Sequence, residues 1–434
     1  AMTIAKQVDE KIISGEKLMP LEGIPISLKD SISTKDIETT CCSKMLKGYY
    51  PIYDATVWEI LKKQNSILLG KTNMDEFAMG SSCETSIFGG TFNPYNTAYV
   101  AGGSSGGAAS SVAGNLATFA LASDTGGSIR QPASFCGVVG FKPTYGTVSR
   151  YGVIAYTSSL DQVGTITNSV EDAAIVYDSI SLHDSKDATS LGSKMTSHDK
   201  LGKSIKGLKI GIAKECFEGI NEDIDKAIED AIKVYKDLGA EIDHFNMPKL
   251  DKVLQAHFII SCAEASSSLA RYDGIRYGFK TDSYKDINEM IYKNRRAGLG
   301  KEVQRRIMLG TYMLSSEYYD IYFKKAQNLR ASFIQEIKKV FEKYDLIITP
   351  STPTTAYKRG QALRDPIGTY MMDICTAPAN LAGLPAISIP CGFDNNKMPI
   401  GMQLMGNSFE DDKVLNAAYQ YEKETKIPTQ EVLL

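Results

Sequence analysis

The sequence of 434 residues has only four histidines and eight cysteines, and neither type forms a pattern that binds metal or builds a disulfide framework. The cysteines include no C-x-x-C pair, and Cys41 and Cys42 are adjacent, so we expect free thiols in a reducing compartment. The histidines show no H-x-H or helical pairing, which argues against a zinc site. The last of them is His257, so the C-terminal part of the sequence has no histidine that could act as a base.

An excess of positive charge is also absent, because 48 Lys and Arg face 51 Asp and Glu, which gives a net charge of −3. The chain as a whole lacks the basic footprint of a nucleic-acid-binding protein, although contact with RNA through a partner stays open. No apolar run is long enough for a transmembrane helix, and the polar N-terminus does not resemble a signal peptide. We therefore expect a cytoplasmic globular protein with no membrane contact.

Short β-branched runs alternate with amphipathic segments, which predicts an α/β fold. The predicted strands are 24–28, 67–71, 138–142, 208–213, 241–245, 346–349, 386–390 and 400–404, and the predicted helices are 54–64, 170–180, 223–238, 317–343 and 411–424. Within these, 208–245 predicts a complete β-α-β unit, since its helix has one apolar face and ends before Gly239. Residues 182–206, rich in Ser, Asp and Lys, predict a surface loop or linker.

Small residues dominate from Ala101 to Ser128, where Asp124 is the only charged side chain. Small residues let backbones approach closely, and buried hydroxyls must find internal hydrogen-bond partners. The stretch is therefore either one wall of a reaction site or a tightly packed core helix.

Three motifs of known chemistry occur here without the context that they need. GGSSGG at 102–107 fits the G-x-S-x-G elbow of α/β-hydrolases, but a turn-rich loop precedes it and no histidine follows residue 257. Gly70-Lys71-Thr72 resembles the end of a P-loop, but Asn65 stands where the first Gly belongs. The S-x-x-K pairs that begin at Ser14 and Ser197 lack the partner motifs of β-lactamase-like enzymes.

A hydroxyl nucleophile without a histidine base points to a lysine base. Lys29 ends the apolar run GIPISLKD at 23–30, and desolvation at a strand end lowers the pKa of an amine. The alternative is that Lys29 extends to the surface. A second Gly-Gly-Ser lies in DTGGSIR at 124–130, where consecutive small residues can direct backbone N–H groups to one point, as in an oxyanion hole.

Taken together, Lys29, GGSSGG at 102–107 and DTGGSIRQPA at 124–133 resemble the amidase signature family in residue type, order and separation. The resemblance runs from about Met19 to about Tyr421. It implies one α/β domain over 1–434, with a central mixed, twisted β-sheet flanked by helices on both faces. It also implies that a subregion at about 183–300 covers the site, and that an N-terminal helical segment of the family is absent here.

Within the family, the stretches 70–82, 141–146, 264–278, 305–311 and 378–385 resemble the glutaminase (A) subunit of the glutamyl-tRNA(Gln)/aspartyl-tRNA(Asn) amidotransferases. That resemblance implies hydrolysis of glutamine, with the ammonia passing to a partner that amidates the misacylated tRNA. It implies two further subunits, B and C, with tRNA bound through the former, no cofactor in this chain, and ATP and Mg on a partner. The alternatives are a stand-alone amidase for another small amide and a non-catalytic scaffold subunit.

The resemblance also assigns roles within the site. Ser128 is the nucleophile, and a neutral Lys29 draws its proton through Ser104, which follows a cis Gly103–Ser104 peptide. The backbone N–H groups of Thr125, Gly126, Gly127 and Ser128 form the oxyanion hole.

Two charged residues are expected to choose the substrate. Arg306 binds the carboxylate of glutamine and Asp373 binds its ammonium group, unless they are a surface arginine and a helix cap. The sequence departs from the family at 257–258, where His257 and Phe258 replace a tyrosine pair.

Overall fold

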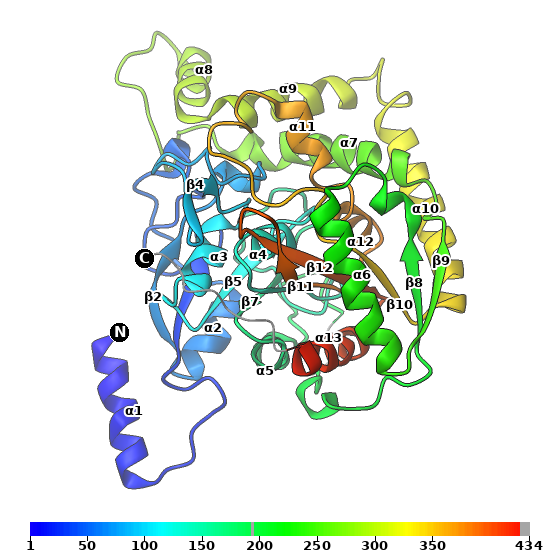
Figure 1. Ribbon diagram of the computed structural model, residues 1–434. Helices are drawn as coiled ribbons and strands as arrows, with labels where there is room; N and C mark the ends of the chain where they lie inside the picture. Colours follow the sequence, from blue (N-terminus) through cyan, green and yellow to red (C-terminus); the bar gives the residue numbers. More distant parts are fainter. Residues whose placement is uncertain (192–194, 426–434) are drawn as a thin grey trace.

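The computed structural model describes residues 1–191 and 195–425, and within them ten strands form one sheet in the order β2-β1-β5-β7-β6-β11-β12-β10-β8-β9 (Figure 1). The strands of this sheet are β1 (Pro25–Lys29), β2 (Ile67–Thr72), β5 (Phe119–Asp124), β6 (Val139–Lys142), β7 (Gln162–Thr167), β8 (Lys209–Ala213), β9 (Glu241–Phe245), β10 (Leu346–Pro350), β11 (Ala386–Phe393) and β12 (Pro399–Gly406). A short hairpin of β3 (Phe92–Asn93) and β4 (Asn96–Val100) lies outside it.

Both strand orientations occur in the sheet. β2, β1 and β5 are parallel at one end, and β10, β8 and β9 are parallel at the other. The strands between them pair in antiparallel fashion. The predicted mixed α/β sheet is therefore confirmed, and so is the β-α-β unit at 208–245, which consists of β8, α6 and β9.

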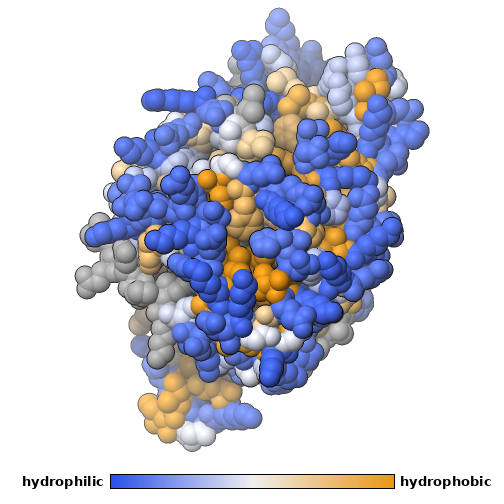
Figure 2. Space-filling view, turned by 45° about the vertical axis from the view of Figure 1, so that its right-hand side comes forward, coloured by the Kyte–Doolittle hydropathy of each residue, from blue (hydrophilic) through white to orange (hydrophobic). Residues whose placement is uncertain are grey.

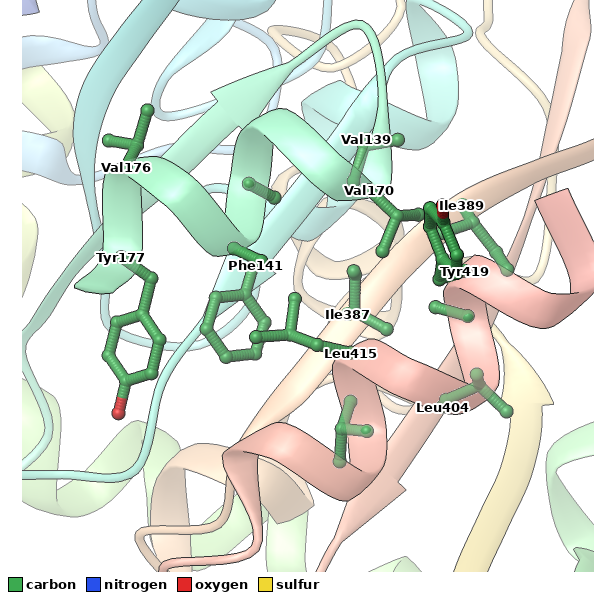
Figure 3. Close-up of a cluster of buried hydrophobic side chains, with 14 of the residues drawn as sticks. Val139, Phe141, Val170, Val176, Tyr177, Ile387, Ile389, Leu404, Leu415 and Tyr419 are labelled. Carbon is green, nitrogen blue, oxygen red and sulfur yellow. The ribbon is translucent and has the colours of Figure 1, made fainter. Parts of the chain in front are cut away.

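One face of the sheet packs against four helices through large apolar side chains. The helices are α2 (Thr56–Lys63), α5 (Val170–Ile180), α6 (Glu222–Asp237) and α13 (Asp411–Thr425). Figure 3 shows Phe141 of β6 between Tyr177 of α5 and Leu415 of α13, and the two aromatic rings are 5.2 Å apart. Each such side chain contributes about 1.5–3 kcal/mol on burial, so this face is the main apolar core.

The opposite face holds small residues next to the predicted site. The helices on this face are α3 (Gly106–Ala113), α4 (Arg130–Phe135), α7 (Leu250–Ser268), α10 (Phe323–Lys343) and α12 (Ala377–Leu381). Ala120 and Ala122 of β5 lie among the alanines of α3 and α4, while Leu121 points to the large core. The uncharged stretch from 101 to 128 is thus both a packed helix and a wall of the site.

The same alternation of side chains aims Lys29 at this face. Ile26 and Leu28 of β1 belong to the large core, whereas Ser27 Oγ lies 3.0 Å from Ser111 Oγ beside α3. Successive side chains of a strand point to opposite faces, so Lys29 follows Ser27 rather than Leu28.

Residues 183–300 contribute to two separate places. β8, α6 and β9 extend the edge of the sheet, while α7 packs against α9 (Lys301–Leu314), α10 and α12 and reaches the site. The segment over the site therefore continues past residue 300 into α9, and α8 (Ile287–Gly298) lies beside it in Figure 1. The remaining helices are α1 (Met2–Ser14) and α11 (Pro366–Met371).

The surface in Figure 2 is mostly hydrophilic, with apolar side chains gathered in separate patches. Among the residues described, no helix is both long enough and apolar enough to cross a bilayer. The predicted loop at 182–206 has no α-helix or strand in its described part, and its residues 192–194 lie outside the described residues.

Candidate active site

Lys29 is fully buried, and its amine is surrounded by oxygen atoms. Nζ lies 2.8 Å from Ser104 Oγ, 2.8 Å from Ser105 Oγ and 3.1 Å from the carbonyl oxygen of Ser123. When the amine loses one proton, two N–H groups remain for Ser105 and Ser123, and a lone pair faces the hydroxyl of Ser104. The site therefore suits a neutral lysine that takes a proton from Ser104.

Burial is also what tunes this base. Desolvation lowers the pKa of Lys29 to about 8, against the negative charge of Asp124, which raises it. A lysine enclosed in this way does not extend to the surface, so that alternative is wrong. Ser105, the second serine of GGSSGG, has no predicted role, yet it shares the amine of Lys29 with Ser104.

The backbone around Ser104 is held by the neighbouring motifs. The Gly103–Ser104 peptide is cis, as expected. The N–H of Gly103 donates to Gln131 Oε1 at 2.8 Å, and the carbonyl of Ser104 accepts from the N–H of Asp75 at 3.1 Å. Gln131 Nε2 in turn donates to the carbonyl of Ser81 at 2.9 Å, so the 70–82 and 124–133 motifs meet at the relay serine.

Ser128 lies beside the relay with its hydroxyl unoccupied. Its carbonyl accepts from the N–H of Ser105 at 3.2 Å, and the residue is partly exposed where Lys29 and Ser104 are buried. Within the described residues its hydroxyl makes no hydrogen bond, so it is free to meet a substrate. Proton transfer from Ser128 to Ser104 stays a prediction.

A buried ion pair fixes the loop that carries Ser128. Asp124 accepts from the N–H of Gly127 at 2.9 Å and from that of Ile129 at 3.1 Å, on either side of the serine. Arg130 donates to the same carboxylate through Nε and Nη2, each at 3.0 Å. Burial raises the pKa of Asp124, but Arg130 outweighs it and holds that pKa well below its ordinary value, so the clamp stays charged.

This clamp corrects one part of the predicted oxyanion hole. Because the N–H of Gly127 is directed at Asp124, it is not free to stabilise an oxyanion. The N–H groups of Thr125, Gly126 and Ser128 make no hydrogen bond within the part of the chain that the structure describes. The donors left for an oxyanion are therefore these three.

A cavity of about 370 Å³ lies between α9 and the loop around residues 76–85. Its lining includes Arg306, Glu302, Tyr370 and Ser82, while Lys29, Ser104 and Ser128 are not among the lining residues. Ser81 and Ser82 connect it to the relay, since Ser81 accepts from Gln131, which holds Gly103. The cavity thus adjoins the nucleophile rather than containing it.

Arg306 is buried in this cavity's wall, so it is not a surface arginine. Its Nε donates to Glu302 Oε1 at 2.8 Å, one helical turn earlier, and Nη1 donates to the hydroxyl of Tyr156. Its guanidinium also faces the ring of Tyr370, 5.2 Å from its centroid. The predicted cation for a carboxylate is therefore present, but Glu302 already shares it.

Asp373 is partly accessible yet closely enclosed, and its carboxylate makes no hydrogen bond within the described residues. Burial raises the pKa of Asp373 to about 7, while the nearby charge of Arg306 lowers it. The N-cap of α12 is Thr376, so Asp373 does not cap that helix. An unpaired carboxylate near the guanidinium fits a ligand that carries both charges.

The departure at 257–258 lies in this site. His257 Nε2 is 2.9 Å from the carbonyl oxygen of Thr125, and burial lowers the pKa of His257 to about 4. The ring of Phe258 stacks at 4.7 Å on Tyr370 and faces Arg306. Both residues thus touch groups that were assigned to catalysis or binding.

Comparison with known proteins identifies the family. The family model described as Amidase matches residues 1–415. The chain belongs to the amidase family. Its Lys29, Ser104 and Ser128 positions, with a cis peptide before Ser104, fit the signature from which the resemblance was inferred.

Individual amidases resemble the chain over nearly its full length. It is 51% identical to the glutamyl-tRNA(Gln) amidotransferase A subunit of Prochlorococcus marinus, over 98% of this chain and 90% of that protein. It is 53% identical to the protein of the same name from Thermoanaerobacter pseudethanolicus, over 98% and 87%. The crystal structure of the glutamyl-tRNA(Gln) amidotransferase A subunit from Thermotoga maritima matches with a TM-score of 0.82 and 43% identity, covering 94% of this chain and 86% of that one.

Proposed function

We propose that this chain hydrolyses glutamine as the glutaminase component of a tRNA-dependent amidotransferase and releases ammonia for amidation of Glu-tRNA(Gln) or Asp-tRNA(Asn). One observation carries the proposal: a lysine–serine relay at 2.8 Å adjoins a cavity that offers a guanidinium and an unpaired carboxylate. Free glutamine bears one carboxylate and one ammonium group, and these two charges complement Arg306 and Asp373. The names of the relatives support the same activity.

The reaction begins with proton transfer and acylation. Neutral Lys29 takes the proton of Ser104 Oγ, which takes that of Ser128, and Ser128 Oγ bonds to the side-chain amide carbon of glutamine. The N–H groups of Thr125, Gly126 and Ser128 stabilise the oxyanion. When it collapses, the C–N bond breaks and the proton returns through Ser104 to the leaving nitrogen, so ammonia departs.

Hydrolysis of the ester completes the cycle. A γ-glutamyl ester remains on Ser128, and water attacks it along the same proton path. The products are glutamate and a free Ser128, so the chain needs no cofactor for its own step. In this proposal residues 1–434 act as one amidase-signature domain.

The partners belong to the proposal as well. The relatives are named as the A component of their amidotransferases, which supports two further subunits, here B and C, with tRNA reached through the former. Activation of the tRNA-bound carboxylate by ATP and Mg is assigned to a partner, and the complex is placed in the cytoplasm.

The pH dependence tests the two shifted groups together. Lys29 acts as a neutral amine and Asp373 as a carboxylate, so both must lose a proton, near pH 8 and pH 7 respectively. We expect kcat/KM for glutamine to rise from about pH 6 to about pH 8.5. In Asp373→Asn the contribution near pH 7 disappears and the one near pH 8 stays. A profile that is flat over this range in the wild type contradicts these assignments.

Arg306→Ala tests how the substrate is chosen. A hydrogen bond to a charged group contributes about 1.5–3 kcal/mol, so its loss is expected to raise KM for glutamine roughly ten- to a hundred-fold. The assay compares glutamine with butyramide, an uncharged amide, in the wild type, in Arg306→Ala and in Arg296→Ala. Arg296 lies on α8 outside the cavity lining and serves as the matched control. Wild-type enzyme that hydrolyses butyramide as well as glutamine would instead indicate a stand-alone amidase.

A further inference from the structure

His257 is a buried group that the proton path above does not use. Its Nε2 lies 2.9 Å from the carbonyl oxygen of Thr125, and a carbonyl only accepts, so this nitrogen carries the proton. Burial and then the charge of Arg306 act to lower the pKa of His257, which is about 4. The ring is therefore neutral near pH 7, where it donates a hydrogen bond but exchanges no proton.

The acceptor of that hydrogen bond belongs to the Thr125–Gly126 peptide. This peptide is trans, so its C=O and its N–H point in opposite directions. Donation from His257 to the carbonyl of Thr125 directs the N–H of Gly126 away from α7. That N–H is one of the three that make no hydrogen bond within the described residues.

The neighbouring groups are fixed by other side chains. Thr376 Oγ1 donates to the carbonyl of Gly126 at 2.6 Å, and the N–H of Gly127 donates to Asp124. The hydroxyl of Thr125 donates to Asp161 Oδ1 at 2.6 Å. In the described part of the chain, His257 is thus the group that fixes the plane of the Thr125–Gly126 peptide.

Glycines at 126 and 127 make these contacts possible. A Cβ on Gly126 would lie 2.6 Å from His257 Cε1, and one on Gly127 would collide with Thr376 Oγ1. The loop can therefore accept two side-chain donors on consecutive carbonyls only because these residues have no side chain. The arrangement favours a loop that is preorganised before substrate binds.

We propose that His257 is a positioning residue of the oxyanion hole, which aims the N–H of Gly126 at the developing oxyanion through its hydrogen bond to Thr125. The inference rests on the proposed hydrolysis at Ser128. It implies that His257 affects the chemical step and leaves the binding of ground-state glutamine nearly unchanged.

The test compares His257→Met with His257→Gln in the chain assembled with its partner subunits. The two side chains have similar shape, but only Gln keeps an N–H donor. We expect Met to lower kcat for glutamine by roughly 10- to 100-fold, less than the loss of a whole donor, with KM nearly unchanged. Gln is expected to restore most of the loss, and the pH profile stays the same in both variants, since His257 does not titrate in the working range.

A second readout is the inhibition constant of the aldehyde analogue of glutamine, which forms a tetrahedral adduct with a serine nucleophile. In His257→Met this constant should rise by the factor by which kcat falls. Equal losses in Met and Gln, a wild-type kcat in folded His257→Met, or an altered pH profile would each overturn the inference. If the Met variant does not fold, His257→Leu takes its place.

Ser128→Ala is assayed alongside. Residual hydrolysis in that variant would refute the proposed nucleophile, whereas an inactive Ser128→Ala beside a fully active His257→Met refutes only the role of His257.

Discussion

Ser128→Ala is expected to abolish glutamine hydrolysis, with kcat falling by a factor on the order of 10⁶, because nucleophile and base act as a unit. The hydroxyl that would form the ester is partly exposed and lies next to the Ser104–Ser105 pair. The measurement is release of glutamate from glutamine by the chain with its partner subunits. Ser110→Ala is the matched control, since Ser110 lies on α3 and donates to the carbonyl of Phe92 at 3.0 Å, away from Lys29. Substantial activity in Ser128→Ala would place the nucleophile elsewhere.

Lys29→Arg is expected to lower kcat by roughly 10³- to 10⁴-fold, because a guanidinium stays protonated and cannot take the proton of Ser104. Lys29→Met removes the base without adding volume and should show a similar loss. Thermal melts of both variants separate this effect from unfolding, since Lys29 is fully buried.

The double variant Lys29→Met/Ser128→Ala should be no slower than Ser128→Ala alone. Strictly additive losses would mean that the lysine does not act through the serine, and that outcome would contradict the relay.

The sequence predicts most of the sheet but not its centre. All eight predicted strands occur, whereas β5 and β7 are missed. β5 consists of Phe119–Asp124 and contains alanines, which have low β-propensity, and tertiary packing between α3 and the sheet overrides that preference. α7 is missed because buried residues occur all around it, so it has no amphipathic stripe. The helix predicted to begin at residue 317 begins at Phe323.

The candidate site shows a similar division. The motifs place Lys29, Ser104 and Ser128, because their residue types and order are distinctive. They do not show that Asp124 takes the N–H of Gly127, since that depends on how the loop folds back on its own carboxylate. The pairing of Arg306 with Glu302 could have been predicted from their spacing of one helical turn.

The most direct test is to look for the covalent intermediate. The chain with its partner subunits is mixed with glutamine, quenched in acid, digested with trypsin and mapped by mass spectrometry. Ser104 and Ser128 fall in one tryptic peptide, 72–130, because no Lys or Arg lies between Lys71 and Arg130, so fragmentation must assign the modified serine. We predict a γ-glutamyl ester on Ser128 that is absent from Ser128→Ala. A glutamyl group on Ser104 or on another residue, with Ser128 unmodified during turnover, would contradict the mechanism.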